Sequence, residues 1–276
     1  MMPDSIIVRC GEMFLKGGNL PYFENKLLQN TRAITGISAV TKLRGRLILP
    51  YFPHHSSLRR VFGISSYSPA VKAEKTVEGL QTTALAILPG KPGTFKVETR
   101  RSDKRFPLTS PQINKEVGQY IEASTKWQFD FVHPKIMVCI EINNGGAYLY
   151  TEIVAGAGGL PVGTAGKVYL LLENESDVLA GILMMKRGCD IIPIGVGKEP
   201  EISLLQRFSP KKIKTIVVGN TKELQDYIKK NNISVIVTGE AFETKKERKE
   251  IMVLRPLIGY TKGQIREGLE RYKDVA

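Results

Sequence analysis

The stretch KVYLLLENESDVLAGILMMKRGCDIIPI, Lys167 to Ile194, decides the fold class of the C-terminal part of the chain. It contains an apolar strand, a short polar turn, a helix and a second apolar strand, the order in which a nucleotide-binding domain begins. Its turn is unsuited to phosphate, because a phosphate-binding turn needs glycines that let backbone N–H groups reach the anion. The turn consists of Glu173, Asn174, Glu175, Ser176 and Asp177.

The alternation of strand and helix continues to the C-terminus. The segments 189–196, 213–219 and 234–240 are apolar strands without a polar face, and a helical pattern over 221–232 separates the last two. Strands of this kind are typical of a parallel sheet that is covered on both faces. We therefore predict a shortened, doubly wound α/β domain in this part of the chain.

The residues before this domain mix strands and helices in another way. A strand over 5–10 and a helix over 20–34 precede a hairpin over 39–50 that turns near Gly45. These elements predict a first small α/β unit.

A second unit follows, with a helix over 110–124 and a hairpin over 135–154 that turns at Asn143 to Gly146. The glycine-rich stretch 155–167 then reads as a linker. The sequence therefore predicts domain breaks near residue 60 and within this linker.

The charge balance favours a polyanionic partner. The chain has 40 Lys and Arg against 27 Asp and Glu, a formal net charge of +13. The first 60 residues are the most unbalanced part, with 9 basic and 3 acidic side chains.

The remaining composition, 42% hydrophobic and 24% charged, is that of a globular protein. No apolar run approaches the length of a bilayer span, and the first residues do not resemble a signal peptide. We therefore expect a cytoplasmic protein without a membrane partner. The cysteines Cys10, Cys139 and Cys189 lie in or beside apolar runs, so we expect buried side chains and no metal site.

A resemblance to a known family is carried by FKVETRRSDKRFPLTSPQINKEVG, residues 95–118, which resembles the centre of a THUMP domain, an RNA-binding module. The segment 9–27 resembles the ferredoxin-like unit of tRNA 4-thiouridine synthetases, and the segments 150–172 and 253–265 are similar to the same family in the same order. The resemblance implies three domains: 1–60 ferredoxin-like, 61–160 THUMP, and 166–276 a PP-loop domain. It also implies that the first two bind tRNA and that the third uses ATP to activate a uridine before sulfur transfer.

The third domain departs from the family pattern. Where the family has Ser-Gly-Gly-x-Asp-Ser, this chain has ENESD, so carboxylates stand near the expected phosphate position and repel it. The alternative interpretation of the turn is structural, with Ser176 or Asp177 capping the helix. After residue 240 the sequence AFETKKERKEI is a charge run, which we expect to form a solvated helix face. We predict no cofactor, and ATP with magnesium only if the domain is active.

The candidate RNA-binding residues are mostly cations. The segment RRSDKRF, residues 100–106, collects four cations beside one aromatic ring, which suits phosphate contact together with stacking on a base. The alternative is a solvated loop with its ring turned inward. The full set of candidates is Lys16, Lys42, Arg44, Arg46, Arg59, Arg60, Arg100, Arg101, Lys104, Arg105 and Phe106.

Three functions are consistent with these patterns. The leading hypothesis is a tRNA-binding protein with a degenerate PP-loop domain that assists a paralogous or other tRNA-modifying enzyme. The second is an active tRNA sulfurtransferase. The third is a homodimeric scaffold without physiological RNA, in which the apolar helix LAGILMMK forms the interface, although such spacing more often belongs to a core.

Overall fold

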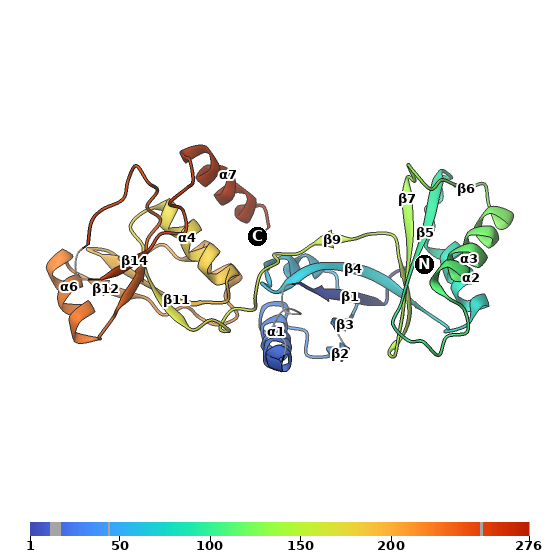
Figure 1. Cartoon of the computed structure of the whole chain (residues 1–276), viewed down its shortest axis with the longest axis horizontal. Coiled ribbons are helices and arrows are strands. Elements are labelled where there is room, and N and C mark those ends of the chain that lie inside the picture. The colour runs from blue at the N-terminus through green and yellow to red at the C-terminus, as the bar shows by residue number, and fades with distance from the viewer. Residues whose placement is uncertain (12–17, 44, 249–250, 276) are drawn as a thin grey trace. The chain divides into compact units, whose positions relative to one another are not determined.

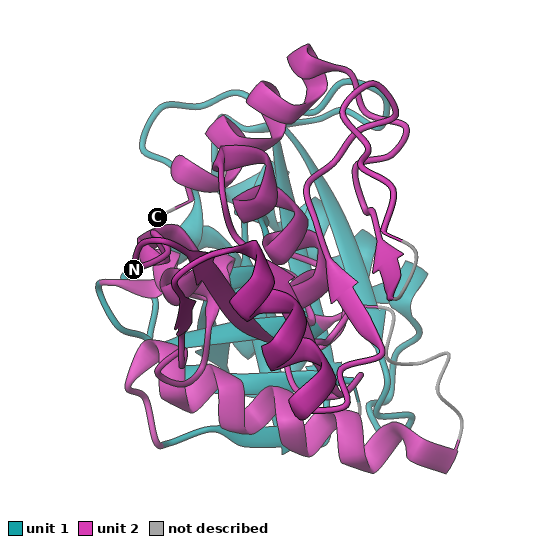
Figure 2. Ribbon diagram, turned by 90° about the vertical axis from the view of Figure 1, so that its left-hand side faces the viewer, with its two compact units in different colours: residues 1–9, 39–53, 66–155 teal, residues 10–38, 54–65, 156–276 magenta. Residues whose placement is uncertain are grey.

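The computed structural model describes residues 1–11, 18–43, 45–248 and 251–275. Two compact units share these residues, as the two colours in Figure 2 show. Unit 1 comprises residues 1–9, 39–53 and 66–155, and unit 2 comprises residues 10–38, 54–65 and 156–276. The N-terminal segment is therefore divided between the two units.

Unit 1 is built on a mostly antiparallel sheet with the strand order β2-β3-β1-β4-β8-β7-β5-β6, and β9 pairs with β4 (Figure 1). Both predicted hairpins are confirmed, since β2 pairs with β3 and β7 pairs with β8. The strands are β1 (Ser5–Cys10), β2 (Thr41–Leu43), β3 (Arg46–Pro50), β4 (Ile64–Ala73), β5 (Thr94–Arg101), β6 (Gln128–Phe129), β7 (Ile136–Asn143), β8 (Gly146–Tyr150) and β9 (Val154–Ala155).

Two helices, α2 (Val77–Ile87) and α3 (Ser110–Ser124), pack with β5, β7 and β8 around one hydrophobic core. Side chains along β5 alternate in burial, so Phe95 and Val97 face this core while Lys96 and Arg100 do not. The alternation follows from the two-residue repeat of a strand.

Unit 2 contains a second sheet, in which all strands run parallel in the order β12-β11-β10-β13-β14. Its strands are β10 (Lys167–Leu171), β11 (Asp190–Val196), β12 (Ile216–Val218), β13 (Val235–Val237) and β14 (Met252–Leu254). Its helices are α4 (Glu175–Lys186), α5 (Ser203–Phe208), α6 (Thr221–Lys230) and α7 (Lys262–Lys273). The predicted parallel α/β architecture is confirmed.

The helix α1 (Leu20–Thr35) and the short 3-10 helix η2 (His55–Arg60) belong to unit 2. The Asn30 amide donates a hydrogen bond to the carbonyl of Val162 over 3.0 Å, and the ring of Phe62 stacks on that of Phe208 with centroids 5.5 Å apart. The two compact units do not correspond one to one with the three domains expected from the sequence. The ranges 1–60, 61–160 and 166–276 therefore stay a prediction.

Three local expectations are corrected. The edge strand β14 was not expected, because its three residues lie between a charge run and the Arg255–Pro256 pair. The described part of the charge run, 241–248, is a turn and loop, not a helix. Helix α4 buries Leu179, Ile182 and Met185 in the core of unit 2, so it does not present the apolar interface of the scaffold hypothesis.

None of the described helices has the length and apolar character needed to cross a bilayer.

Two mid-helix glycines give a matched test of the packing. A Cβ at Gly118 in α3 would meet only Val97 Cγ2 at 4.0 Å, whereas one at Gly181 in α4 would lie 2.7 Å from Leu170 Cδ2 and 3.0 Å from Leu205 Cδ2. We expect Gly118→Ala to stabilise its unit by about 0.5–1 kcal/mol through helix propensity. We expect Gly181→Ala to destabilise its unit by about 1–3 kcal/mol, because both leucines are fully buried. Urea unfolding of the two variants measures both changes, and equal effects would contradict the packing described.

Candidate functional site

A buried carboxylate on β7 binds side chains from three other strands of unit 1. Glu141 on β7 accepts hydrogen bonds from Arg9 Nε at 3.0 Å, from the Tyr150 hydroxyl at 3.0 Å and from Arg46 Nε at 2.9 Å. Arg9 also donates to Ser68 Oγ, and its guanidinium lies 4.7 Å from the centre of the Tyr150 ring. We call Arg9, Arg46, Glu141 and Tyr150 the Glu141 cluster.

The charges in this cluster do not cancel. Burial alone would raise the pKa of Glu141, but the guanidinium groups of Arg46 and Arg9 outweigh it and hold that pKa below its usual value. Burial and the neighbouring carboxylate raise the pKa of Tyr150, which therefore stays a neutral donor. Two cations thus face one anion, and the excess positive charge lies next to a cavity.

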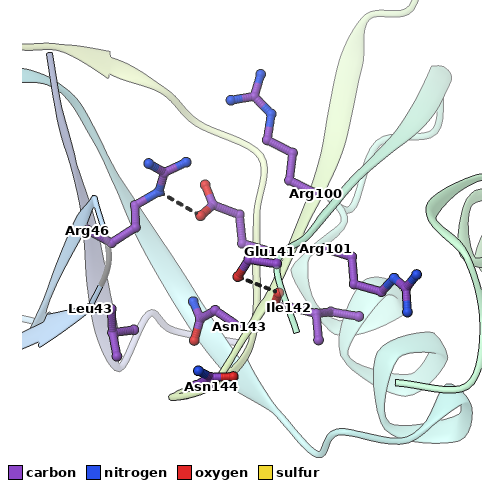
Figure 3. A pocket seen from close by; sticks show the side chains of 9 residues that line it. Leu43, Arg46, Arg100, Arg101, Glu141, Ile142, Asn143 and Asn144 are labelled. Atoms are coloured by element: carbon purple, nitrogen blue, oxygen red, sulfur yellow. Dashed lines mark hydrogen bonds and ion pairs between the residues drawn. The ribbon is translucent and has the colours of Figure 1, made fainter. Parts of the chain in front are cut away.

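That cavity has a volume of about 300 Å³ and opens beside Arg46, Arg100 and Arg101 (Figure 3). The three arginines come from β3 and from the end of β5, and all three are among the candidates from the sequence. We call this the arginine cavity. The residues that line it are Leu43, Arg46, Arg100, Arg101, Ser102, Glu141, Ile142, Asn143 and Asn144.

The loop after β5 is ordered by another buried acid. Asp103 accepts hydrogen bonds from the backbone N–H and the guanidinium of Arg105, at 2.9–3.0 Å, and pairs with the Lys75 ammonium. The side-chain hydrogen bonds from Arg105 and Lys75 hold the pKa of Asp103 well below its usual range. Arg105 and Lys75 thus share one carboxylate, which holds the exposed side chain of Arg105 in place.

The ring of Phe106 corrects one prediction. Phe106 is 4% exposed and packs into the core with Val97 and Ile113, so it does not lie at the surface where it could stack on a base. Arg101 holds the loop above it by donating to the carbonyl of Phe106 over 2.8 Å. Lys104 is exposed at the tip of the loop. The inward-turned ring, the alternative interpretation, is what the structure contains.

The other candidates are dispersed. Lys42 is exposed on β2 in unit 1, while Arg59 and Arg60 are half-buried on η2 in unit 2. Lys16 and Arg44 lie outside the described residues. Of the candidates that the structure describes, Arg46, Arg100 and Arg101 line one cavity, and Lys104 and Arg105 lie on the adjoining loop.

The turn before α4 uses its polar groups internally. Asn174 is the N-cap, and its side chain accepts from the backbone N–H of Ser176 at 3.0 Å. Asp177, one of the two caps expected from the sequence, completes a capping box with it. The buried carboxylate of Asp177 accepts from the backbone N–H groups of Glu173 and Asn174 at 3.0 Å and of Gly239 at 2.5 Å. Burial raises the pKa of Asp177 above its usual value, although these three hydrogen bonds oppose the shift.

The turn before α4 packs against the end of β13, and its Glu173 also lines a cavity of about 840 Å³. A Cβ at Gly239 would lie 2.3–2.4 Å from backbone atoms of Ser176 and Asp177, so the end of β13 is packed directly against the start of α4. Glu173 and Glu175 are exposed, and the Lys246 ammonium lies 3.8 Å from Glu173. Glu240 binds Arg248 and Arg255 at 2.6 and 2.8 Å. These residues do not fit ATP with magnesium, since donors are already bonded and carboxylates face the site.

The three cysteines are buried and reduced. Burial raises the pKa of Cys139 to about 11 and raises that of Cys189 above its usual value. A thiolate is the form that attacks sulfur, so neither side chain is prepared for that chemistry. Within the part of the chain that the structure describes, no group of His, Cys, Asp or Glu side chains is arranged to hold a metal ion.

Sequence reasoning missed the acids that arrange the cations. Glu141 lies in an apolar strand, and its charge in the run MVCIEI is the one signal that pointed to a buried partner. Asp103 and Lys75 are 28 residues apart in sequence, and nothing local predicts their contact.

Comparisons with known proteins agree with this architecture. The THUMP domain model matches residues 74–152, and the ThiI ferredoxin-like domain model matches residues 5–68. A probable tRNA sulfurtransferase from Moorella thermoacetica is 43% identical over 200 residues, covering 69% of this chain and 51% of the relative. One from Lactobacillus delbrueckii subsp. bulgaricus is 34% identical over 265 residues, covering 90% of this chain and 63% of the relative. The chain thus spans between half and two thirds of these relatives.

Solved structures give the same result. The crystal structure of PH1313 from Pyrococcus horikoshii Ot3 has a TM-score of 0.85 and 31% identity, and the match covers 98% of this chain and 99% of that one. A 4-thiouridine synthetase in complex with RNA and bound ATP has a TM-score of 0.80 over 98% of this chain and 85% of that one; at 23% identity, that likeness shows the fold alone.

The class of protein is therefore an α/β protein with a ferredoxin-like domain, a THUMP domain and a parallel-sheet domain, as the sequence predicted. Its homologues are named tRNA sulfurtransferases. The chain belongs to the ThiI family.

The Glu141 cluster gives a test of stability against pH. Glu141→Gln leaves Arg9 and Arg46 without their carboxylate, and breaking such a buried pair costs about 3–5 kcal/mol near neutral pH. Because folding lowers the pKa of Glu141, its contribution is present above the unfolded value of about 4.3 and is lost as pH falls through the folded value. The difference between wild type and Glu141→Gln should therefore shrink below about pH 4.3.

Denaturant unfolding at several pH values measures this difference. Glu98→Gln is the control, since it removes an exposed partner of Arg100 at 3.3 Å and should change stability little. A difference that stays constant down to pH 3 would show that the ion pairs do not stabilise the fold.

Proposed function

We propose that this protein binds tRNA through the arginine cavity and the adjoining loop, and that its parallel-sheet domain has lost ATP binding and sulfur transfer. As a tRNA-binding protein in the cytoplasm, it assists a second, catalytically active tRNA-modifying enzyme. The support for RNA binding is the THUMP domain together with a cavity whose lining includes three arginines, Arg46, Arg100 and Arg101, and one carboxylate, Glu141. Guanidinium groups bind phosphate with paired donors, and phosphate contacts supply most of the affinity of such interfaces.

The observation that carries the loss of activity is the turn before α4. The N–H groups that would hold a triphosphate already donate to the side chains of Asn174 and Asp177. The second candidate, an active sulfurtransferase, is favoured by the names of the relatives. That enzyme would need a phosphate site other than this turn and a sulfur donor that does not use the three buried cysteines.

The RNA interface predicts a change in salt dependence. Arg100 and Lys104 are exposed, and the ion pair of Arg100 with Glu98 is itself exposed. Replacing both with Ala should therefore lower the slope of log affinity against log salt by about 1.8, at about 0.9 for each phosphate contact. Arg105→Ala alone should lower the slope by less than about 0.9, because its guanidinium already donates two hydrogen bonds to Asp103. Filter binding of tRNA over a salt series measures the three slopes.

A double variant of α6, Lys222→Ala with Lys230→Ala, is the matched control, since it removes two exposed cations from unit 2. If the control lowers the slope as much as Arg100→Ala with Lys104→Ala, binding depends on net charge and the assigned interface is wrong.

The loss of activity is tested by calorimetry and by a thiolation assay. Titration of the protein with ATP and magnesium should give no measurable heat of binding. Incubation with tRNA, ATP and sulfide should yield no thiolated uridine. A micromolar dissociation constant for ATP, or thiolated tRNA that disappears with Cys189→Ser, would support the active enzyme instead.

A further inference from the structure

A cavity of unit 2 lies at the amino ends of β10 and β11. It has a volume of about 220 Å³, and its lining includes Lys167, the first residue of β10, and Asp190, the first residue of β11. These two residues pair in the register of the parallel sheet. The turn before α4 follows the other end of β10, so this cavity is separate from that turn. We call it the lysine cavity.

The polar lining of the lysine cavity is mostly cationic. It contains Lys167, Lys211, Lys212 and Lys214, with Asp190 as the acid among them, a formal excess of three positive charges. The Lys211 ammonium is paired, since it lies 2.7 Å from Asp190 Oδ2. Among the residues that the structure describes, the ammonium groups of the other three lysines have no hydrogen-bond or ion-pair partner. Those three charges are therefore available to a ligand.

The loop 209–214 carries three of these lysines and is held in one conformation by its own side chains. Gln206 Nε2 donates to the carbonyl of Lys211 at 2.9 Å, and Gln206 Oε1 accepts from the backbone N–H of Ile213 at 2.9 Å. Ser209 Oγ donates to the same carbonyl at 2.7 Å. Ile213 is buried in the core of unit 2, so the loop presents its lysines from a fixed backbone. A site ordered in advance loses less entropy when it binds.

A structural role for these lysines is the alternative, because cations near the end of a helix can bind its last carbonyl groups. At the end of α4 those carbonyls are already bonded to the backbone. The carbonyl of Lys186 accepts from the N–H of Leu160 at 2.9 Å. The carbonyl of Gly188 accepts from the N–H groups of Gly163 and Ala165 at 2.8 and 3.0 Å. The lysines are therefore not needed to close this helix, and their accumulation around one cavity favours an anionic ligand.

The walls and the size of the cavity limit the kind of anion. Val162, Met185, Ile191 and Ile213 line it and are between 1% and 7% exposed, so part of the ligand meets apolar surface. The volume is below the range of about 300–1,000 Å³ that is usual for drug-sized ligands, so a nucleoside triphosphate is too large. Lysine binds phosphate as a point charge, whereas planar carboxylates favour the paired donors of arginine.

The arrangement of the cations also distinguishes a small ligand from RNA. Proteins that bind a nucleic-acid backbone have a positively charged groove that follows it. Here Lys167 on β10 and the loop lysines line the same cavity instead. The observations therefore favour a compact molecule with one phosphate group.

We propose that the lysine cavity binds a small phosphate monoester. Its phosphate lies among the ammonium groups of Lys167, Lys212 and Lys214, and its apolar part lies against Met185 and Ile191. The inference goes beyond the proposed function, since none of these residues belongs to the arginine cavity or to the turn before α4.

Phenyl phosphate is the probe, and phenol and inorganic phosphate represent its two halves. Calorimetry of the whole chain at low ionic strength should show saturable binding of phenyl phosphate, weaker binding of inorganic phosphate and no binding of phenol. Lys212→Ala with Lys214→Ala should weaken the binding of phenyl phosphate by about tenfold or more, because two charge-assisted hydrogen bonds are lost. Lys222→Ala with Lys230→Ala is the matched control and should leave this affinity unchanged.

Acetylation of lysines, read by mass spectrometry, locates the site. Phenyl phosphate should protect Lys212 and Lys214 from acetylation and should leave Lys222 as reactive as before. The absence of saturable binding, or an equal loss of affinity in both double variants, would overturn the proposal. Protection of Lys212 and Lys214 by tRNA but not by phenyl phosphate would identify the loop as an RNA contact and would also contradict the small-ligand site.

Discussion

The hydrogen-bonded carboxylate of Glu141 is the interaction on which unit 1 depends. It joins β7 to β1 through Arg9 and to β3 through Arg46, although β7 pairs with neither of these strands in the sheet. A charge buried to this extent is tolerated only when it is paired and fully bonded, and removal of either partner leaves an uncompensated charge. The same contact fixes Arg46 at the rim of the arginine cavity. Stability and the candidate RNA interface therefore rest on one group.

In unit 2 the N-terminus of helix α4 is closed by side chains. The free N–H groups and the positive dipole end of a helix can bind an anion such as phosphate, or a side-chain cap can satisfy them. At α4 the N-cap is Asn174, and the buried Asp177 completes the capping box. The backbone at Gly239 packs directly against the start of the helix. The parallel α/β scaffold of unit 2 forms whatever this turn binds, because the apolar strands and the core determine it. The proposed loss of ATP binding concerns only the turn.

How much the sequence could predict follows from the range of the interactions involved. Strand and helix periodicity gave the parallel sheet and both hairpins, because these patterns are local. The sequence also located Arg46, Arg100 and Arg101, but it could not show that they share one cavity, since Glu141 is 95 residues from Arg46. Phe106 was misjudged because an aromatic residue beside cations looks the same whether it points outward or into the core.

Hydrogen–deuterium exchange of the whole chain, measured alone, with tRNA and with ATP and magnesium, tests the central claim most directly. The account predicts that tRNA slows exchange in peptides covering 41–48 and 98–106, while ATP changes nothing in peptides covering 172–178. Slower exchange of the Glu173–Asp177 turn with ATP, together with unchanged exchange at 98–106 with tRNA, would contradict it.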